Sequence, residues 1–548
     1  MFCNQCEQTF RHDQSIGCTL KGVCGKMPST AALQNVIIYA LEGLSVYLYN
    51  LRKNQIINEE ISKYILYSTF STLTNVNFDD QALINIIKKL SGYITEMRNK
   101  CNMLNIKLDK TPKEILFNVS EHTNASLVQL GNTIARKQKN NLINEDIDSL
   151  RNLILYGIKG ICAYAHHASI LDKTDHAIFE KIEYSFYLLA IKESDNNTLL
   201  NWAVNLGSVN FEVLKLLNDG HLDAFGTPQP TKVNITAKKG KAILVSGHDL
   251  KDLEAILKAT EDTGINVYTH GEMLPGNSYP KLSQYKHLIG NYGGAWQNQH
   301  IDFAKFPGAI IVTSNCIQKP MPEYENRLFT TGPVGWPGIQ HISDNEYKQL
   351  IDSAMKQPGF NEDEAEKQIM VGFGKDTVLS LADKIIDNVK SGSIRRFYLI
   401  GGCDGAELSR NYFTEIAEHI DKNSIILTLG CAKYRFNKQE FGDINGIPRL
   451  LDIGQCNDSY SAIQIAIALA NAFQCSVNEL PLSFYISWLE QKAVAVFLTL
   501  LYLGITDIHL GPKLPGFLSQ NILNTLIEKY NIKPTTNALS DLQAEAIY

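Results

Sequence analysis

Four cysteines crowd the start of the chain. Cys3, Cys6, Cys18 and Cys24 follow the spacing C-x2-C-x11-C-x5-C. Four thiols so close together are typical of an iron–sulfur cluster, because thiolates are the usual ligands of such clusters. A zinc ion is the alternative, since tetrahedral thiolate sites have similar spacing. The motif therefore predicts a metal centre near the first residue.

A second set of potential metal ligands follows six predicted strands. Each strand runs directly into a histidine, a glutamate or a cysteine, namely His248, Glu272, Cys316, Cys403, Cys431 and Cys456. In parallel sheets the carboxyl ends of the strands form the crevice in which ligands bind. A lone cysteine at a strand end is more often a small buried hydrophobic residue. Six ligand-type residues in the same position nevertheless predict one metal site.

The donor types in this second set are mixed. Thiolates favour iron–sulfur chemistry, whereas His248 and Glu272 offer harder nitrogen and oxygen donors. Glu490 is a further candidate, because a carboxylate before an apolar helix is costly unless it is paired or bound to metal. An ion pair with a buried Arg or Lys is the other interpretation of Glu490. Hard ligands indicate iron that is not saturated with sulfur, which leaves a position open for a substrate.

The elements that must carry these residues fall into three parts. Long amphipathic runs such as Ala31–Leu51 and Asp80–Met103 predict an all-helical region. Six short apolar strands follow: Ala242–Ser246, Asn266–Thr269, Ala309–Thr313, Phe397–Ile400, Ser424–Thr428 and Arg449–Ile453. Strands that alternate with helical segments are typical of parallel α/β sheets. A polar stretch, interpreted as helical, divides them at Asn361–Ser391. We expect an α plus α/β multidomain fold with domains 1–225, 226–385 and 386–548.

Composition limits the possible functions. The 548 residues are 44% hydrophobic and 20% charged, which is typical of a globular protein with several cores. The net charge of -6 offers no basic footprint for nucleic acid. We find no signal peptide, and the apolar run Ala493–Ile505 is too short to span a bilayer. We expect a cytoplasmic protein that binds neither nucleic acid nor a membrane. In that reducing compartment eleven cysteines favour metal or redox chemistry over disulfides.

Several long, specific strings occur from Met1 to the last helices of the chain. These strings are MFCNQCEQT, GVCGK, YGIKGICAYAHHA, SGHDLKDLE, VYTHGEMLP, GNYGGAWQ, TSNCI, TTGPVGWPG, IGGCDGA, LGCAKYRFN, GQCND and SWLEQKAVAVFLTLLYLGI. Together they closely resemble one known family, the hybrid cluster proteins, also called prismane proteins or hydroxylamine reductases. By this resemblance the fold is a helical N-terminal domain followed by two Rossmann-like α/β domains.

The resemblance also implies two cofactors. The family's hybrid 4Fe-2S-2O cluster takes ligands at positions that here are His248, Glu272, Cys316, Cys403, Cys431, Cys456 and Glu490. In the family the cysteine that matches Cys403 carries an extra sulfur as a persulfide. The cysteines Cys3, Cys6, Cys18 and Cys24 match the ligands of a second cluster, which passes electrons inward. Their spacing leaves both 4Fe-4S and 2Fe-2S open for that cluster.

The activity implied by the resemblance is reduction of hydroxylamine to ammonia and water. Candidate proton donors are Lys492, Glu272 and Glu490. Reduction of nitric oxide to nitrous oxide is an alternative, and a non-catalytic nitrosyl carrier or sensor that uses Cys403 is another. The chain has no G-x-G-x-x-G fingerprint after a strand, so we do not expect it to bind NADH. A separate NADH-dependent flavin and iron–sulfur reductase is the implied electron donor.

Overall fold

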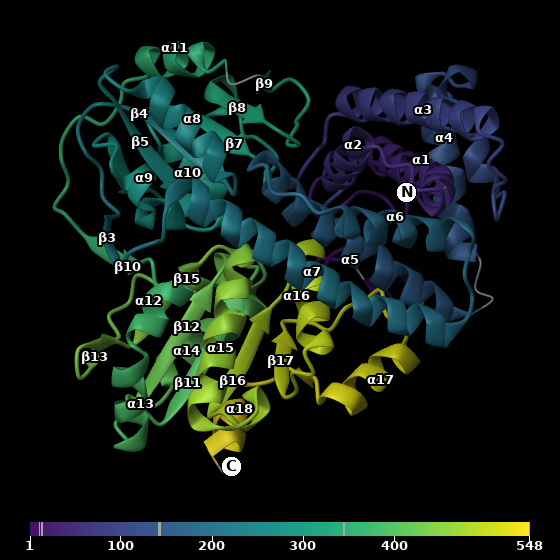
Figure 1. The fold of residues 1–548 in the computed structure, drawn as a ribbon. Coiled ribbons are helices and arrows are strands. Elements are labelled where there is room, and N and C mark those ends of the chain that lie inside the picture. Colours follow the sequence, from purple (N-terminus) through teal and green to yellow (C-terminus); the bar gives the residue numbers. More distant parts are fainter. Residues whose placement is uncertain (10, 13–14, 141–143, 344–345, 547–548) are drawn as a thin grey trace.

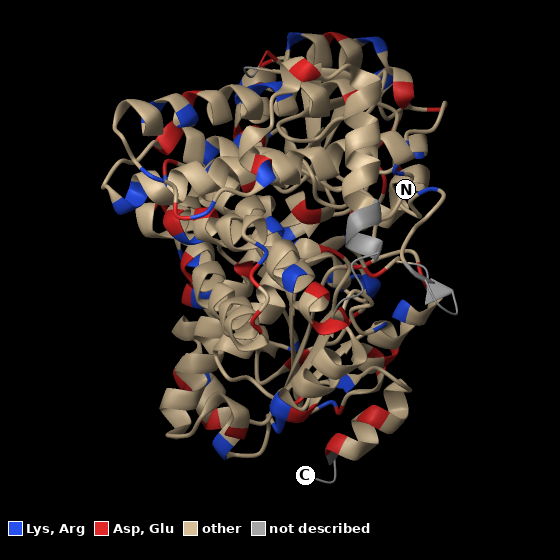
Figure 2. Cartoon of the chain, turned by 90° about the vertical axis from the view of Figure 1, so that its right-hand side faces the viewer, with Lys and Arg blue, Asp and Glu red and all other residues tan. Residues whose placement is uncertain are grey.

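The computed structural model describes residues 1–9, 11–12, 15–140, 144–343 and 346–546. A helical region lies beside two α/β regions, each built on a sheet (Figure 1). Two small antiparallel hairpins complete the strands, β1 (Arg11–His12) with β2 (Ser15–Ile16) and β13 (Asp443–Ile444) with β14 (Ile447–Pro448). Lys and Arg are intermingled with Asp and Glu along the chain (Figure 2), as the nearly balanced composition predicts.

Seven helices form the N-terminal region. They are α1 (Pro28–Lys53), α2 (Glu59–Phe70), α3 (Asp80–Met103), α4 (Asn124–Asn140), α5 (Glu145–Ile170), α6 (His176–Ala190) and α7 (Asn196–Phe225). Asn or Asp side chains cap the first turns of α2, α3, α5, α6 and α7, and so satisfy backbone N–H groups that lack a partner within the helix. By length and composition α1 could cross a membrane, but 83% of its most apolar window is buried inside the protein. It is therefore a core helix of this region.

The first α/β region contains an eight-stranded sheet. In spatial order its strands are β10 (Gln368–Val371), β3 (Thr231–Asn234), β6 (Leu288–Asn291), β5 (Ile265–His270), β4 (Lys241–Gly247), β7 (Ala309–Thr313), β8 (Leu328–Thr331) and β9 (Gln340–Ile342). All neighbours are parallel except the edge pair β10 and β3. The helices of this region are α8 (Leu250–Thr260), α9 (Pro280–Ser283), α10 (Gln299–Lys305) and α11 (Lys348–Lys356).

The second α/β region contains a six-stranded, fully parallel sheet. Its spatial order is β15 (Leu450–Gly454), β12 (Ser424–Leu429), β11 (Arg396–Gly402), β16 (Leu482–Ser487), β17 (Ile508–Gly511) and β18 (Lys533–Pro534). Its helices are α12 (Lys375–Ser380), α13 (Ala382–Lys390), α14 (Asn411–His419), α15 (Ser459–Phe473), α16 (Gln491–Tyr502), α17 (Gln520–Tyr530) and α18 (Ala538–Ala546). Helix α16 packs against α5 and α7, which joins this region to the helical one.

Both sheets reverse their strand order at one point. In the first sheet β4, β5 and β6 run outward on one side while β7, β8 and β9 run outward on the other. In the second sheet β11, β12 and β15 mirror β16, β17 and β18 in the same way. This is the 3-2-1-4-5-6 order of the Rossmann fold, in which ligands bind beyond the carboxyl ends of the strands at the reversal. The topology therefore marks the ends of β4 and β7, and of β11 and β16, as places for a site.

The sequence-based expectations for the fold are largely confirmed. The helical N-terminal region, the parallel α/β sheets and all six predicted strands are present, and Ala493–Ile505 begins within the buried helix α16. The expectation of a helix throughout Asn361–Ser391 is wrong, because Gln368–Val371 pairs with β3 as an edge strand. The domain limits at residues 225 and 385 stay a proposal. Helix α7 ends at Phe225, directly before the first sheet.

Candidate metal centres

Seven ligand-type side chains follow strands of the two sheets, four of them at the reversal points and three on other strands of the same sheets. His248 follows β4, Glu272 follows β5, Cys316 follows β7, Cys403 follows β11, Cys431 follows β12, Cys456 follows β15 and Glu490 follows β16. The donor atoms of His248, Glu272 and Cys456 all lie within 4.8 Å of one another. These three residues come from two different sheets. The strand ends of the two α/β regions therefore converge on one place.

A buried lysine lies against the histidine of this set. Lys492 Nζ is 3.0 Å from His248 Nε2 and 3.2 Å from Asn315 Oδ1. His248 Nε2 lies 3.8 Å from Glu272 Oε2, and Lys492 Nζ lies 4.0 Å from Glu490 Oε1. Burial, together with Lys492, lowers the pKa of His248 well below its usual value, so its ring is neutral. A neutral imidazole is the form that binds a metal.

The four thiols of the set influence one another electrostatically. Burial raises the pKa of Cys403 well above that of an ordinary thiol, and Glu490 and Cys456 raise it further. The pKa of Cys431 is raised in the same way, first by burial and then by Glu272 and Cys316. Burial also raises the pKa of Cys456 to about 12. Without a cation the structure would hold these groups as neutral thiols, whereas a metal would favour their thiolates.

The residues present fit a multinuclear metal group. His248 Nδ1 and Glu272 Oε1 are buried and have no hydrogen-bond partner among the described residues. The set offers four thiols and two carboxylates, and burial raises the pKa of both carboxyl groups, Glu272 and Glu490. Buried groups of this kind are stable when they are paired or coordinate a metal. Soft sulfur and harder nitrogen and oxygen donors suit iron bound by both kinds of ligand.

Gln455 joins the two sheets beneath this set. Its side-chain Nε2 donates to the backbone oxygens of His248 at 2.9 Å and Glu272 at 2.6 Å. The next residue, Cys456, donates its N–H to Glu272 Oε2 at 2.7 Å. One amide therefore fixes the backbone of two ligand-type residues relative to a third. Sequence reasoning missed this role, because the partners of Gln455 are 207 and 183 residues away along the chain.

Replacing Gln455 by Met should destabilise the protein by about 1–3 kcal/mol, the usual cost of leaving buried polar groups without a partner. Both carbonyls would lose their donor, since Gln455 is only 1% exposed. The shift of the urea unfolding midpoint measures the effect. The matched control is Gln439→Met, because Gln439 is an exposed glutamine whose side chain donates to Glu418. Equal midpoints for the two variants would contradict the bridging role of Gln455.

Three further residues surround the set. Asn315 Nδ2 lies 3.1 Å from Cys316 Sγ. Tyr164 on α5 is buried, and its pKa is raised by burial and by Cys456. The ring of His167, also on α5, stacks at 6.4 Å from that of His248. Asn315 directly precedes a candidate ligand, which is a signal in the sequence. The two α5 residues reach the set only through packing between regions.

A cavity of about 270 Å³ borders the set. Cys403, Cys456 and Tyr164 line one part of it. Most of the other lining residues are apolar and come from β11, β16, α15 and α16, for example Ile463 and Leu500. The cavity therefore offers room for a small molecule beside two of the thiols.

The four N-terminal cysteines also come together. Cys3 and Cys18 exchange backbone hydrogen bonds of 3.1 and 2.7 Å. Burial raises the pKa of Cys6 well above its usual value, and the nearby thiols of Cys24, Cys3 and Cys18 raise it further. Lys159 on α5 is buried beside them, and burial lowers its pKa to about 7. Four neighbouring cysteines, of which Cys6 and Cys18 are buried, suit a thiolate-bound metal.

Comparison with known proteins assigns the chain to a family. The model of one protein family, described as Prismane/CO dehydrogenase family, matches residues 1–543. The chain belongs to this family. Proteins named "Hydroxylamine reductase" from Acidiphilium cryptum and Thermodesulfovibrio yellowstonii are 49% and 48% identical to it. Each match covers 99% of this chain and 98% or 99% of the relative.

Solved structures of carbon monoxide dehydrogenases share the fold. Carbon monoxide dehydrogenase IV from Carboxydothermus hydrogenoformans has a TM-score of 0.56 at 19% identity, and the match covers 99% of this chain and 91% of that one. An acetyl-CoA synthase/carbon monoxide dehydrogenase, whose description names [Fe4S4] clusters, has a TM-score of 0.53 at 17% identity, with 98% and 86% covered. At these identities the likeness extends to the fold alone. It confirms the helical region followed by α/β regions.

Proposed function

We propose that this protein is a hydroxylamine reductase, an iron–sulfur oxidoreductase. The observation that supports the proposal is that donor atoms of His248, Glu272 and Cys456, which follow strands of two Rossmann-like sheets, lie within 4.8 Å of one another. The full-length relatives named hydroxylamine reductase support it. The reaction consumes two electrons and two protons: NH2OH + 2e⁻ + 2H⁺ gives NH3 + H2O.

Two sets of residues would hold the cofactors. A hybrid 4Fe-2S-2O cluster would take its ligands from His248, Glu272, Cys316, Cys403, Cys431, Cys456 and Glu490, with Cys403 as a persulfide. A 4Fe-4S or 2Fe-2S cluster would be held by Cys3, Cys6, Cys18 and Cys24. When bound, the hybrid cluster supplies iron as a Lewis acid together with the electrons that break the N–O bond.

The chain's own residues supply protons and line the cavity. Burial alone would lower the pKa of Lys492, but Cys456, Glu490 and Cys316 raise it above the usual value. Lys492 Nζ therefore keeps its proton at neutral pH, 3.0 Å from His248 Nε2. Glu272 and Glu490 are the other candidate proton donors, because burial raises the pKa of each carboxyl group. The mostly apolar lining of the cavity beside Cys403 offers few hydrogen-bond partners to water.

Electrons must come from another protein. The chain carries no dinucleotide fingerprint, so the donor we propose is a separate NADH-dependent reductase with flavin and iron–sulfur groups. We further propose that the protein works in the cytoplasm, without binding nucleic acid or a membrane. A reducing cytoplasm would keep its thiols available for metal.

Anaerobically purified protein is expected to contain about eight irons per chain, or about six if the N-terminal cluster is 2Fe-2S, since the proposed sites hold four plus four or four plus two. Iron and zinc in the same sample can be measured by plasma mass spectrometry. About four irons together with one zinc would contradict the N-terminal cluster. Little iron of any kind would contradict both sites.

The choice of substrate can be tested by comparing the turnover rates of hydroxylamine and of nitric oxide with the same preparation. Reduced protein is expected to convert hydroxylamine to ammonia, with two electrons consumed for each ammonia formed. Nitric oxide supplied to the same preparation should be converted to nitrous oxide more slowly. Faster formation of nitrous oxide, or no turnover of either compound, would contradict the proposed function.

A further inference from the structure

The N-terminal cysteine segment touches the segment that carries Glu490. Glu7 donates its backbone N–H to the carbonyl of Leu489 at 2.9 Å. Two residues earlier, the carbonyl of Gln5 accepts from Gln491 Nε2 at 2.9 Å. Residues 5–7 and 489–491 are thus joined by two hydrogen bonds. The central residues of the two segments are Cys6 and Glu490, one from each candidate metal centre.

A buried ion pair holds the same two segments together. Arg410 Nη2 lies 3.0 Å from Glu7 Oε2, and both side chains are fully buried. The guanidinium also donates to Ser487 Oγ at 2.6 Å and to the carbonyl of Trp488 at 3.0 Å. Charge-assisted bonds of this kind are shorter and stronger than neutral ones. The residues before Glu490 are therefore tied to the residue after Cys6.

Gln491 is held by contacts with Gln5, Thr74 and helix α5. Besides its bond to Gln5, its Oε1 accepts the N–H of Thr74 at 3.1 Å, and its Nε2 lies 3.3 Å from Thr74 Oγ1. Helix α5 also packs closely here, because a Cβ atom at Gly160 would lie 2.3 Å from the carbonyl oxygen of Gln491. The side chain is fully buried, with no exposed surface. Gln491 therefore has little freedom to move away from Gln5.

We propose that electrons pass between the two metal centres through the contact of residues 5–7 with residues 489–491, and that Gln491 is the residue that positions this contact. The inference rests on the proposed function, because it requires two redox centres. A route of covalent and hydrogen bonds couples two centres electronically better than a gap between unbonded atoms. The second centre is the set of candidate ligands at the strand ends, which includes Glu490. In each transfer one electron leaves the N-terminal centre and arrives at this second centre. Two transfers supply the two electrons that hydroxylamine needs, and Gln491 itself is neither oxidised nor reduced.

The test follows electron transfer in the metal-loaded, full-length protein without hydroxylamine. Protein is mixed rapidly with dithionite and frozen at intervals, and electron paramagnetic resonance reports the reduction of each centre. In Gln491→Leu we expect the second centre to be reduced at least about 10-fold more slowly after the first, the low end of losses when support of a metal site is removed. Iron content and the resting spectra of both centres should match those of the parent protein.

Asn210→Leu is the matched control. Asn210 is also a buried amide that bonds to α16, through Thr499 Oγ1 at 2.9 Å, but it does not bond to the N-terminal segment. Its transfer rate should equal that of the parent, and equal slowing in both variants would overturn the route. If Gln491→Leu does not fold, Glu7→Gln tests the same contact, because it weakens the ion pair with Arg410 while keeping the side-chain shape.

Failure of the route and failure of the proposed function give different results. An unchanged transfer rate in the folded contact variants would overturn the route, even if hydroxylamine is reduced normally. A resting spectrum with no redox-active N-terminal centre would overturn it as well. Slowed transfer in Gln491→Leu alone would support the route, and it would do so even if the parent protein failed to turn over hydroxylamine.

Discussion

Lys492→Met is expected to lower hydroxylamine turnover by about 100-fold or more, the low end of what a positioned acid or base contributes. The ammonium group is buried, lies 3.0 Å from His248 Nε2, and carries a proton at neutral pH because the nearby acidic groups raise its pKa. Met keeps the length and apolar part of the side chain but has no proton to give. Steady-state turnover per iron-loaded molecule measures the effect.

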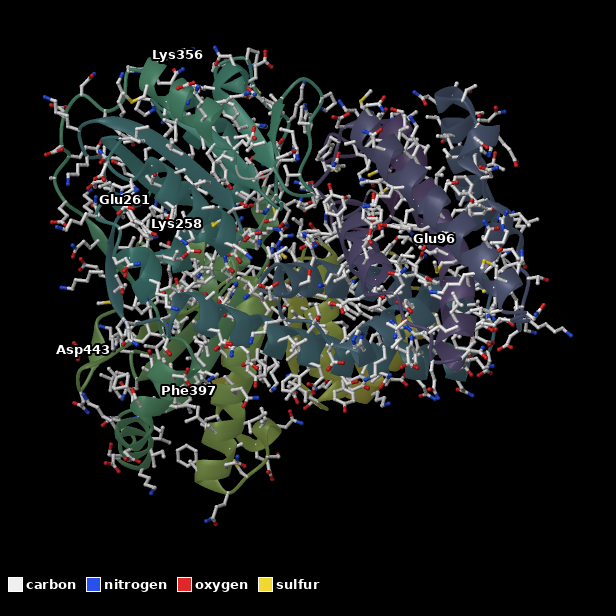
Figure 3. The ribbon with its side chains drawn as sticks, turned by 45° about the horizontal axis from the view of Figure 1, so that its top comes forward. Glu96, Lys258, Glu261, Lys356, Phe397 and Asp443 are labelled. Carbon is white, nitrogen blue, oxygen red and sulfur yellow. The ribbon has the colours of Figure 1, made fainter. Side chains whose placement is uncertain are left out.

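The control for this variant is Lys356→Met. Lys356 is an exposed residue on α11, at the edge of the molecule (Figure 3). Its replacement should leave turnover unchanged. Wild-type turnover in Lys492→Met, at full iron content, would remove Lys492 from the reaction. Loss of iron together with activity would instead indicate that Lys492 mainly stabilises the bound metal.

Glu490→Gln is expected to alter the spectrum of the second centre and to lower turnover by about 10-fold or more, as when support of a metal site is lost. The amide keeps the shape of the carboxylate but loses the negative charge that binds iron. The structure also allows a purely structural role, since Glu490 Oε2 accepts the N–H of Lys492 at 3.0 Å and caps helix α16. A cap alone would be worth about 1 kcal/mol of stability.

The spectrum separates these two roles. If Glu490 only caps α16, the variant should lose stability while its folded fraction keeps the parent spectrum and turnover. Glu96→Gln is the control for a general charge effect, because Glu96 is exposed on α3 in the helical region (Figure 3). A parent-like spectrum and parent-like turnover per folded molecule would exclude Glu490 from the second centre.

Much of the fold could be predicted because its signals are local. The strands Ala242–Ser246 and Ala309–Thr313 are continuous apolar runs, as expected for strands buried on both faces. Most of the missed strands are short or at edges. Gln368–Val371, for example, is a four-residue edge strand in a polar stretch, too short to show a period. β16 was missed as well, although it is the strand that leads to Glu490.

The candidate site was predictable where a potential metal ligand directly follows a predicted strand. His248 and Cys403 stand directly after apolar runs, so their position carries the signal. The roles of Gln455 and Tyr164 have no such local signal, because they depend on contacts between regions that are far apart in the sequence. The central place of the site follows from the order of the strands in each sheet. That order is a property of long-range pairing, which single-strand patterns do not contain.

The central claim is that one centre holds iron through both sulfur and harder donors. X-ray absorption at the iron K-edge of anaerobically prepared protein tests this directly. The account predicts that Fe–S scattering is accompanied by a distinct Fe–N/O shell, and that this shell becomes smaller in a His248→Ala variant. A spectrum that needs only sulfur and iron neighbours, unchanged by that substitution, would contradict the account.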